Sequence, residues 1–261
     1  MQTEWYIFPL LIASGALAGF VNTLTGSGSL VSLAMLVFAG LPANVANGTN
    51  RLGVLVQSLV GVGTFARQSK MHVPGSEWFI VPAIAGSILG AIVATDLNKE
   101  VMEKVLGTVM VVMLGVIIYK PKKWQRAMSE AAQNKTVLNL AIFFAVGFYG
   151  GFIQAGIGIF LMVALVLGAR FNTQEATVLK MTIVLFLTIP ALVIFIWYNQ
   201  VHWLYGGVMA IGQSVGAWVA ARFALTSPHA ATWTHRLLVA VVVVSIGSLF
   251  GVFAWLGTFF G

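Results

Sequence analysis

A stretch of 46 residues without a single Asp, Glu, Lys or Arg separates Glu4 from Arg51. As one α-helix it would be about 69 Å long, whereas the hydrocarbon core of a bilayer is about 30 Å thick. The segment must therefore fold back on itself within apolar surroundings. We place the break at residues 25–29 (Thr-Gly-Ser-Gly-Ser), because glycine frees the backbone and hydroxyls satisfy the polar groups that a break exposes.

The scarcity of charge extends over the whole chain. Only 8% of the 261 residues are charged, 59% are hydrophobic and the mean hydropathy is +0.95. A soluble domain carries about a quarter charged residues, and a chain of this length cannot enclose so much apolar surface in its own core. The sequence therefore predicts an integral membrane protein. It contains no cysteine, which excludes disulfides and thiolate chemistry.

Apolar runs between turn signals predict the helices of the first half. We expect a half-length segment at 30–40 and full spans at 5–24, 46–65, 78–95 and 101–119. The longest polar stretch holds five cations and one Glu, which indicates a cytoplasmic linker. The predicted organisation is membrane repeat 1 (1–119), a basic linker (120–135) and membrane repeat 2 (136–261).

The second half repeats the pattern of the first at an offset of 130 residues. Without a gap, 26–91 and 156–221 share 11 identities in 66 positions. This is roughly twice the number that chance gives in so biased a composition. The break itself is duplicated, because the glycines at 26 and 28 align with those at 156 and 158. Internal repeats of this kind are typical of transporters.

The distribution of cations favours inverted repeats over parallel ones. With four spans in each half the repeats are parallel, and the 14 cations divide seven and seven between the two faces. With five elements in each half the repeats are inverted, and the division becomes eleven against three. The positive-inside rule favours the second arrangement, with the linker cytoplasmic and the termini periplasmic or extracellular.

The fold class predicted from these patterns is an all-α integral membrane protein of two inverted repeats. Each repeat has about five helical elements, which gives roughly eight full spans plus short or broken helices at the glycine-rich breaks.

The two breaks are the candidate substrate site. In inverted-repeat transporters such breaks lie near the midplane, and the N-termini of the helices that follow attract anions. Arg51 and Lys180 lie on the next helix of each half, and a cation inside a membrane is costly and usually functional. We expect these two to supply charge to a small anion. The expected backbone donors are Gly26, Ser27, Gly28, Gly156 and Gly158, and the side chains expected to orient the anion are Asn22, Thr25, Asn47, Asn50 and Gln154.

Each of these features also has a simpler explanation. Glycine pairs permit close packing of membrane helices. Arg51 and Lys180 have side chains long enough to reach the membrane interface. His72 and His202 align in the repeat, but the inverted topology puts them on opposite faces, so we expect no shared metal site. The net charge of +7 follows from topology and does not require nucleic acid.

An enzymatic function is disfavoured. A membrane hydrolase needs a nucleophile with a base, or a metal cluster, and the apolar segments carry almost no carboxylates. We expect no cofactor and no metal. The expected partners are a small anion and the lipid bilayer, and a homo-oligomer is compatible with the sequence. The alternatives to a transporter are a passive anion channel and a non-transporting assembly or receptor protein.

The order of the motifs resembles the sulfite exporter TauE/SafE family of membrane permeases. The resemblance rests on Gly-Ser-Gly at 26–28, on Ala-Asn-Gly-Thr-Asn at 46–50, similar to the family's Ala-x-Gly-Thr-Ser, and on the glycine pair of 86–90. The second half repeats these with Gly-Ile-Gly at 156–158, Ala176-Thr177, His202-Trp203 and Gly216.

The chain departs from the family pattern at two places. Asn50 stands where the family often has Ser, and Val-Leu-Lys at 178–180 replaces the second Gly-Thr-Ser. The resemblance implies a permease that exports sulfite, sulfonates or related small organic anions across a bacterial inner membrane.

Overall fold

The computed structural model describes residues 5–68, 76–119, 136–171 and 173–226, which form helices joined by turns. The first half contributes α1 (Ile7–Thr25), α2 (Ser29–Phe38), α3 (Ala43–Gln68), α4 (Glu77–Asp96) and α5 (Lys99–Tyr119). The second half contributes α6 (Val137–Phe152), α7 (Ile157–Val163), a π-helical segment η2 (Ala164–Gly168), α8 (Thr173–Trp197) and α9 (Trp203–Thr226).

The helices predicted for the first half are present, and their ends differ from the prediction by at most three residues. Both breaks occur at the predicted glycines. α1 ends before Gly26, whose φ is 82°, and α7 follows Gly156, whose φ is 70°. Left-handed φ values of this kind favour glycine. The predicted linker 120–135, His72 and both termini lie outside the described residues.

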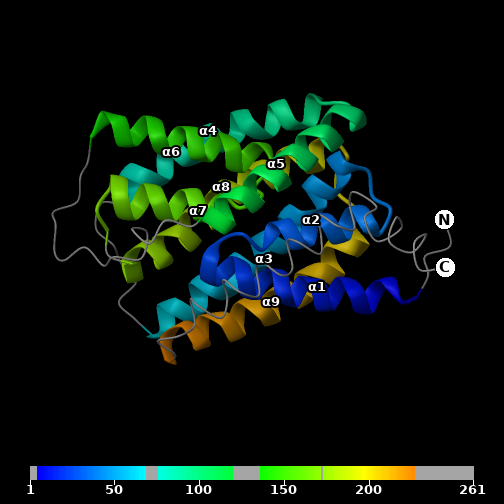
Figure 1. The fold of residues 1–261 in the computed structure, drawn as a ribbon, viewed down its shortest axis with the longest axis horizontal. Coiled ribbons are helices and arrows are strands. Elements are labelled where there is room, and N and C mark those ends of the chain that lie inside the picture. The colour runs from blue at the N-terminus through cyan, green and yellow to red at the C-terminus, as the bar shows by residue number, and fades with distance from the viewer. Residues whose placement is uncertain (1–4, 69–75, 120–135, 172, 227–261) are drawn as a thin grey trace.

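The long helices lie roughly along one axis, with α4 and α6 at one edge of the bundle and α1 and α9 at the opposite edge (Figure 1). Each edge pair combines one helix from each half of the chain. Small residues let these helices approach closely. A methyl group at Gly19 of α1 would lie 2.1 Å from a backbone oxygen of α9, and one at Gly147 of α6 would lie 2.1 Å from a backbone oxygen of α4.

The register of these contacts gives the directions of the helices. Gly212 of α9 lies against Ile12 and Gly216 lies against Ala16, so α1 and α9 are parallel. The contacts of Gly86 with residue 144 and of Gly90 with residue 148 make α4 and α6 parallel in the same way.

The turn between α8 and α9 marks one end of the bundle, which we call the α8–α9 end. Gln200 of this turn donates to the carbonyl of Thr95 at the end of α4, at 3.0 Å. The amide of His202 donates to Thr49 near the start of α3, at 2.8 Å. α1 and α9 also begin here. Since α4 ends at the α8–α9 end and is parallel to α6, α6 begins at the opposite end.

Four described helices are long and apolar enough to cross a membrane, namely those that include 7–24, 77–96, 175–197 and 203–223. α3 is longer than each of these four, but it carries Asn47, Arg51 and Gln57 on its buried side. Large apolar side chains are exposed on the outside of the bundle, as Val81 and Ile211 illustrate. This is the pattern of a multi-pass membrane protein. Eight full spans and the inversion of the repeats stay predictions.

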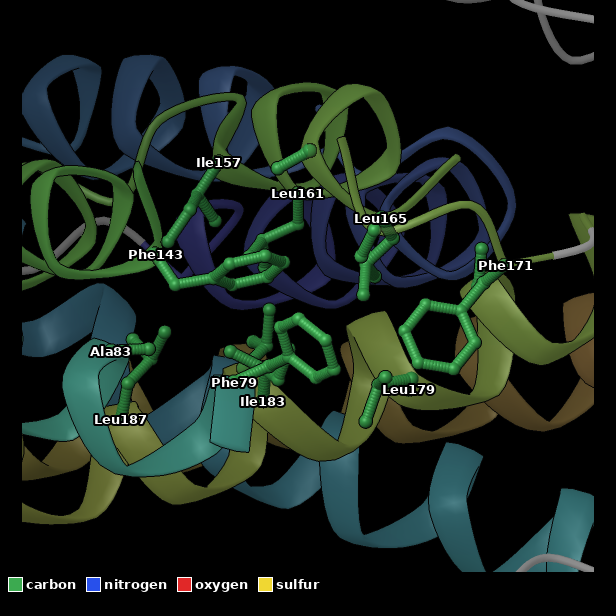
Figure 2. Close-up of a cluster of buried hydrophobic side chains, with 14 of the residues drawn as sticks. Phe79, Ala83, Phe143, Ile157, Leu161, Leu165, Phe171, Leu179, Ile183 and Leu187 are labelled. Carbon is green, nitrogen blue, oxygen red and sulfur yellow. The ribbon is translucent and has the colours of Figure 1, made fainter. Parts of the chain in front are cut away.

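Buried apolar side chains pack between α4, α6, α7 and α8 (Figure 2). The ring of Phe79 lies 4.9 Å from that of Phe143 and 5.4 Å from that of Phe171, measured between centroids. We call the labelled set the apolar cluster: Phe79, Ala83, Phe143, Ile157, Leu161, Leu165, Phe171, Leu179, Ile183 and Leu187.

Candidate functional site

The two glycine breaks lie in direct contact with each other. The amide of Gly158 donates to the carbonyl of Gly26 at 3.0 Å. A methyl group at either glycine would lie 2.2 Å from the Cα of the other. No side chain fits at this contact, so glycine is required at both positions for the breaks to meet. The sequence predicted two breaks, and the structure joins them into one buried junction.

Two side chains of α3 bind the C-terminal end of α6. The guanidinium of Arg51 donates to the carbonyls of Gly150, at 3.0 Å, and of Gly151. Asn47, one turn earlier on the same face, donates to the carbonyl of Phe152 at 2.8 Å. Three successive carbonyls at a helix end have no partner within the helix and carry the negative end of its dipole. α3 therefore caps the broken helix of the other half.

Lys180 of α8 makes the reciprocal contact with the first half. Its ammonium group donates to the carbonyl of Thr23 at 2.9 Å and lies 3.5 Å from that of Asn22, both near the end of α1. Each half of the chain thus supplies a cation that caps the broken helix of the other half.

Both cations are buried without a carboxylate partner in the described part of the chain. The exposed fractions of Arg51 and Lys180 are 0% and 1%, so neither side chain reaches the membrane interface. The ion pair found among the described residues joins Lys99 and Glu103 on the surface. The carboxylates that the structure describes are all exposed: Glu77, Asp96, Glu100, Glu103 and Glu175.

The cations bind the C-terminal ends of helices, whereas the prediction from the sequence concerned the N-terminal ends. A break exposes carbonyls at the end of one helix and amides at the start of the next, and a cation binds the carbonyls. Of the five predicted amide donors, Gly26 donates to Val21 and Gly158 donates to Gly26. Within the described residues, no acceptor binds the amides that remain: Ser27, Gly28 and Gly156.

The other predicted side chains divide between the junction and its surroundings. Thr25 and Ser27 lie at the junction, where their hydroxyl oxygens are 2.9 Å apart. Gln154, at a left-handed φ of 62°, is buried and donates to the hydroxyl of Thr188. Asn50 lies on another face of α3, away from the α6 cap.

Asn50 contacts two polar residues that were not among the predicted site residues, Ser32 and Gln213. Its side-chain oxygen accepts from the hydroxyl of Ser32 at 2.6 Å and lies 3.5 Å from Nε2 of Gln213. The guanidinium of Arg51 also stacks over the ring of Phe195, at 4.4 Å from the ring centroid. The sequence did not predict this contact. The available signal for Ser32 and Gln213 was their polarity within apolar helices.

Comparison with known proteins identifies the family. Residues 11–250 match the sulfite exporter TauE/SafE family. The chain is 26% identical over 225 residues to a probable membrane transporter protein, ORF9, of Sinorhizobium sp, covering 85% of this chain and 84% of that one. It is 29% identical over 216 residues to the probable membrane transporter protein YfcA of Escherichia coli K12, covering 80% and 78%.

A third relative, the probable membrane transporter protein YunE of Bacillus subtilis, is 24% identical over 265 residues, covering 92% of this chain and 96% of that one. No solved structure matches the chain. The relatives' names support a membrane transporter, and the all-helical bundle with its apolar exterior agrees with one. Since the family match spans nearly the whole sequence, the chain belongs to the sulfite exporter TauE/SafE family.

Proposed function

We propose that the protein is a permease for a small anion, such as sulfite, an organosulfonate or a related organic anion. The observation that carries this proposal is the pair of buried cations beside the junction of the two breaks. The family description names sulfite, which is one member of this chemical class. The relatives' names specify a transporter without a substrate.

The energetics of the two cations favour an anionic ligand. Removing an ion from water costs several kcal/mol even after the protein relaxes. Carbonyl dipoles and the ring of Phe195 recover part of that cost, but they leave the net positive charge in place. A bound anion would neutralise this charge. It would also find the amides of Ser27, Gly28 and Gly156 beside the same junction.

Two observations support an inverted arrangement of the repeats, with the site between them. α1 begins at the α8–α9 end of the bundle and α6 begins at the opposite end. Arg51 and Lys180 lie inside the bundle and do not count as loop residues. Without them the inverted topology puts ten cations on the linker side and two, Lys99 and Lys104, on the other. This division corresponds to a cytoplasmic linker and an inner-membrane location.

We propose a transporter that acts without an enzymatic step, a cofactor, a metal or nucleic acid. The surroundings of the protein are the lipid bilayer, and a homo-oligomer stays a prediction. A carboxylate relay for protons is also not part of the proposed transporter, because the carboxylates that the structure describes are exposed.

Ligand-dependent thermal stability of the purified protein tests the substrate class. We expect sulfite or an alkylsulfonate to raise Tm in a concentration-dependent way, with sulfate, acetate and chloride at equal ionic strength as comparisons. A ligand at 100 times its Kd adds about 2.7 kcal/mol of stability. If none of these anions raises Tm, or if chloride alone does so, the proposed substrate class is wrong.

A further inference from the structure

A second group of buried polar side chains lies where α2, α3 and α9 meet. We call it the amide cluster: Ser29, Ser32, Asn50, Gln57 and Gln213, none more than 2% exposed. Asn50 contacts Ser32 and Gln213. Gly53, one turn beyond Asn50, gives Gln213 its space, because a methyl group there would lie 2.6 Å from Oε1 of Gln213. Gln57 follows one turn later on the same face of α3.

Several polar atoms of the amide cluster have no hydrogen-bond partner among the described residues. They are Nδ2 of Asn50, Nε2 and Oε1 of Gln57, Oε1 of Gln213 and the hydroxyl oxygen of Ser29. Leaving a buried donor or acceptor without a partner costs about 1–3 kcal/mol for each group. Both donors and acceptors are present, and a bare anion would satisfy only the donors. Water both donates and accepts, so it fits this mixed set.

The equivalent positions of the other half are apolar except for Lys180, which aligns with Asn50. At the offset of 130 residues, Gly53 aligns with Ile183, Gln57 with Leu187, and Gln213 with Ala83. Ile183, Leu187 and Ala83 all belong to the apolar cluster, where they lie among buried apolar side chains (Figure 2). Two hydroxyls on the same helices bond to the backbone, since Ser87 donates to the carbonyl of Leu187 at 2.7 Å and Thr188 to that of Val184. Gln154, which donates to Thr188, keeps one oxygen without a partner among the described residues.

We propose that the amide cluster is a hydrated part of the transport pathway. The apolar cluster excludes water from the equivalent route in the other half. Water in the amide cluster supplies the hydrogen bonds that the protein leaves unmade. It gives a hydrated anion a polar path along α3 toward the cations. The role of the cluster in transport rests on the proposed function, whereas the hydration of the cluster does not.

Cysteine reactivity tests the proposal, and the chain has no cysteine of its own. The test variants are Gln57→Cys and Gln213→Cys, and their matched controls are Leu187→Cys and Ala83→Cys at the equivalent positions. All four native side chains are at most 1% exposed, so static burial predicts no difference between them. Methyl methanethiosulfonate reacts with the thiolate, which needs water to form.

We expect Gln57→Cys and Gln213→Cys in liposomes to react at least about tenfold faster than their controls, because only hydrated thiols ionise readily. Mass spectrometry gives the rates, and Asn98→Cys on the exposed α4–α5 turn gives the rate of a free surface thiol. Equal rates within each matched pair, or no reaction at either test position, would overturn the proposal.

A second variant covers the case in which a cysteine disturbs the fold. We expect Gln213→Leu to keep the Tm of the parent and to lose most of the anion flux, because it makes this part of the pathway apolar. Parent-like flux in this variant would overturn the pathway role. Equal labelling together with intact anion flux defeats only this inference. A clear labelling contrast without any anion flux defeats only the proposed function.

Discussion

The contact between Gly26 and Gly158 sets how closely the two breaks approach. At each of the two positions, the backbone of the other glycine leaves no room for a side chain. Gly26 also has a left-handed backbone, which an alanine adopts only at a cost. At the residue scale this contact fixes the position of the helix ends that Arg51 and Lys180 cap.

Alanine at either glycine should therefore destabilise the protein. We expect Gly26→Ala, from backbone strain and overpacking, and Gly158→Ala, from overpacking alone, to cost about 2–4 kcal/mol each. Thermal unfolding in detergent measures the effect as a lower Tm. Gly63→Ala and Gly107→Ala are matched controls, since a methyl group there meets nothing within 4 Å. A Tm for Gly26→Ala equal to that of the controls would show that the breaks do not pack as described.

The two buried cations and the glycine breaks of the candidate site were predictable from the sequence, but their partners were not. A cation in a charge-poor segment is visible in the sequence, and so is a duplicated glycine pair. The carbonyls that bind Arg51 are about 100 residues away along the chain, and those that bind Lys180 are about 158 away. Local patterns carry no information on such contacts, so the sequence predicted an anion beside the two cations and did not predict the carbonyls that they bind.

At the scale of elements, local patterns located the helices well. The break after α1 was predicted because a run of 46 uncharged residues cannot form one span. The packing of α1 with α9 and of α4 with α6 was not predicted. This packing depends on glycines such as Gly19 and Gly147, which contact the backbone of a helix from the other half. Helical periodicity does not show which helix packs against a given glycine.

The directions of the helices lead to a prediction about topology. Asn98 lies in the α4–α5 turn and Arg170 lies between η2 and α8, and both are exposed. Inverted repeats with a cytoplasmic linker place Asn98 outside and Arg170 inside, whereas parallel repeats place both on the same side. We expect a membrane-impermeant maleimide to label Asn98→Cys in intact cells. It should label Arg170→Cys only after the membrane is opened. Labelling of both variants in intact cells would exclude the inverted arrangement.

At the scale of the whole molecule, each half of the chain caps a broken helix of the other half. A side chain of α3 holds the end of α6, and a side chain of α8 holds the end of α1. Any movement of one half against the other must therefore change the surroundings of both cations. Such a coupling between the site and the helix ends is what alternating access requires of a repeat-built carrier. A passive channel does not require it.

Anion counterflow in proteoliposomes tests the central claim that Arg51 and Lys180 serve a transported anion. We predict saturable counterflow of sulfite or an alkylsulfonate by the parent protein. Lys180→Met should lose at least about 90% of that flux, because the buried charge that attracts the anion is gone. Lys99→Met, which removes an exposed cation, should keep the flux of the parent protein. Undiminished flux in both Lys180→Met and Arg51→Met, or a non-saturating conductance in the parent protein, would contradict the account.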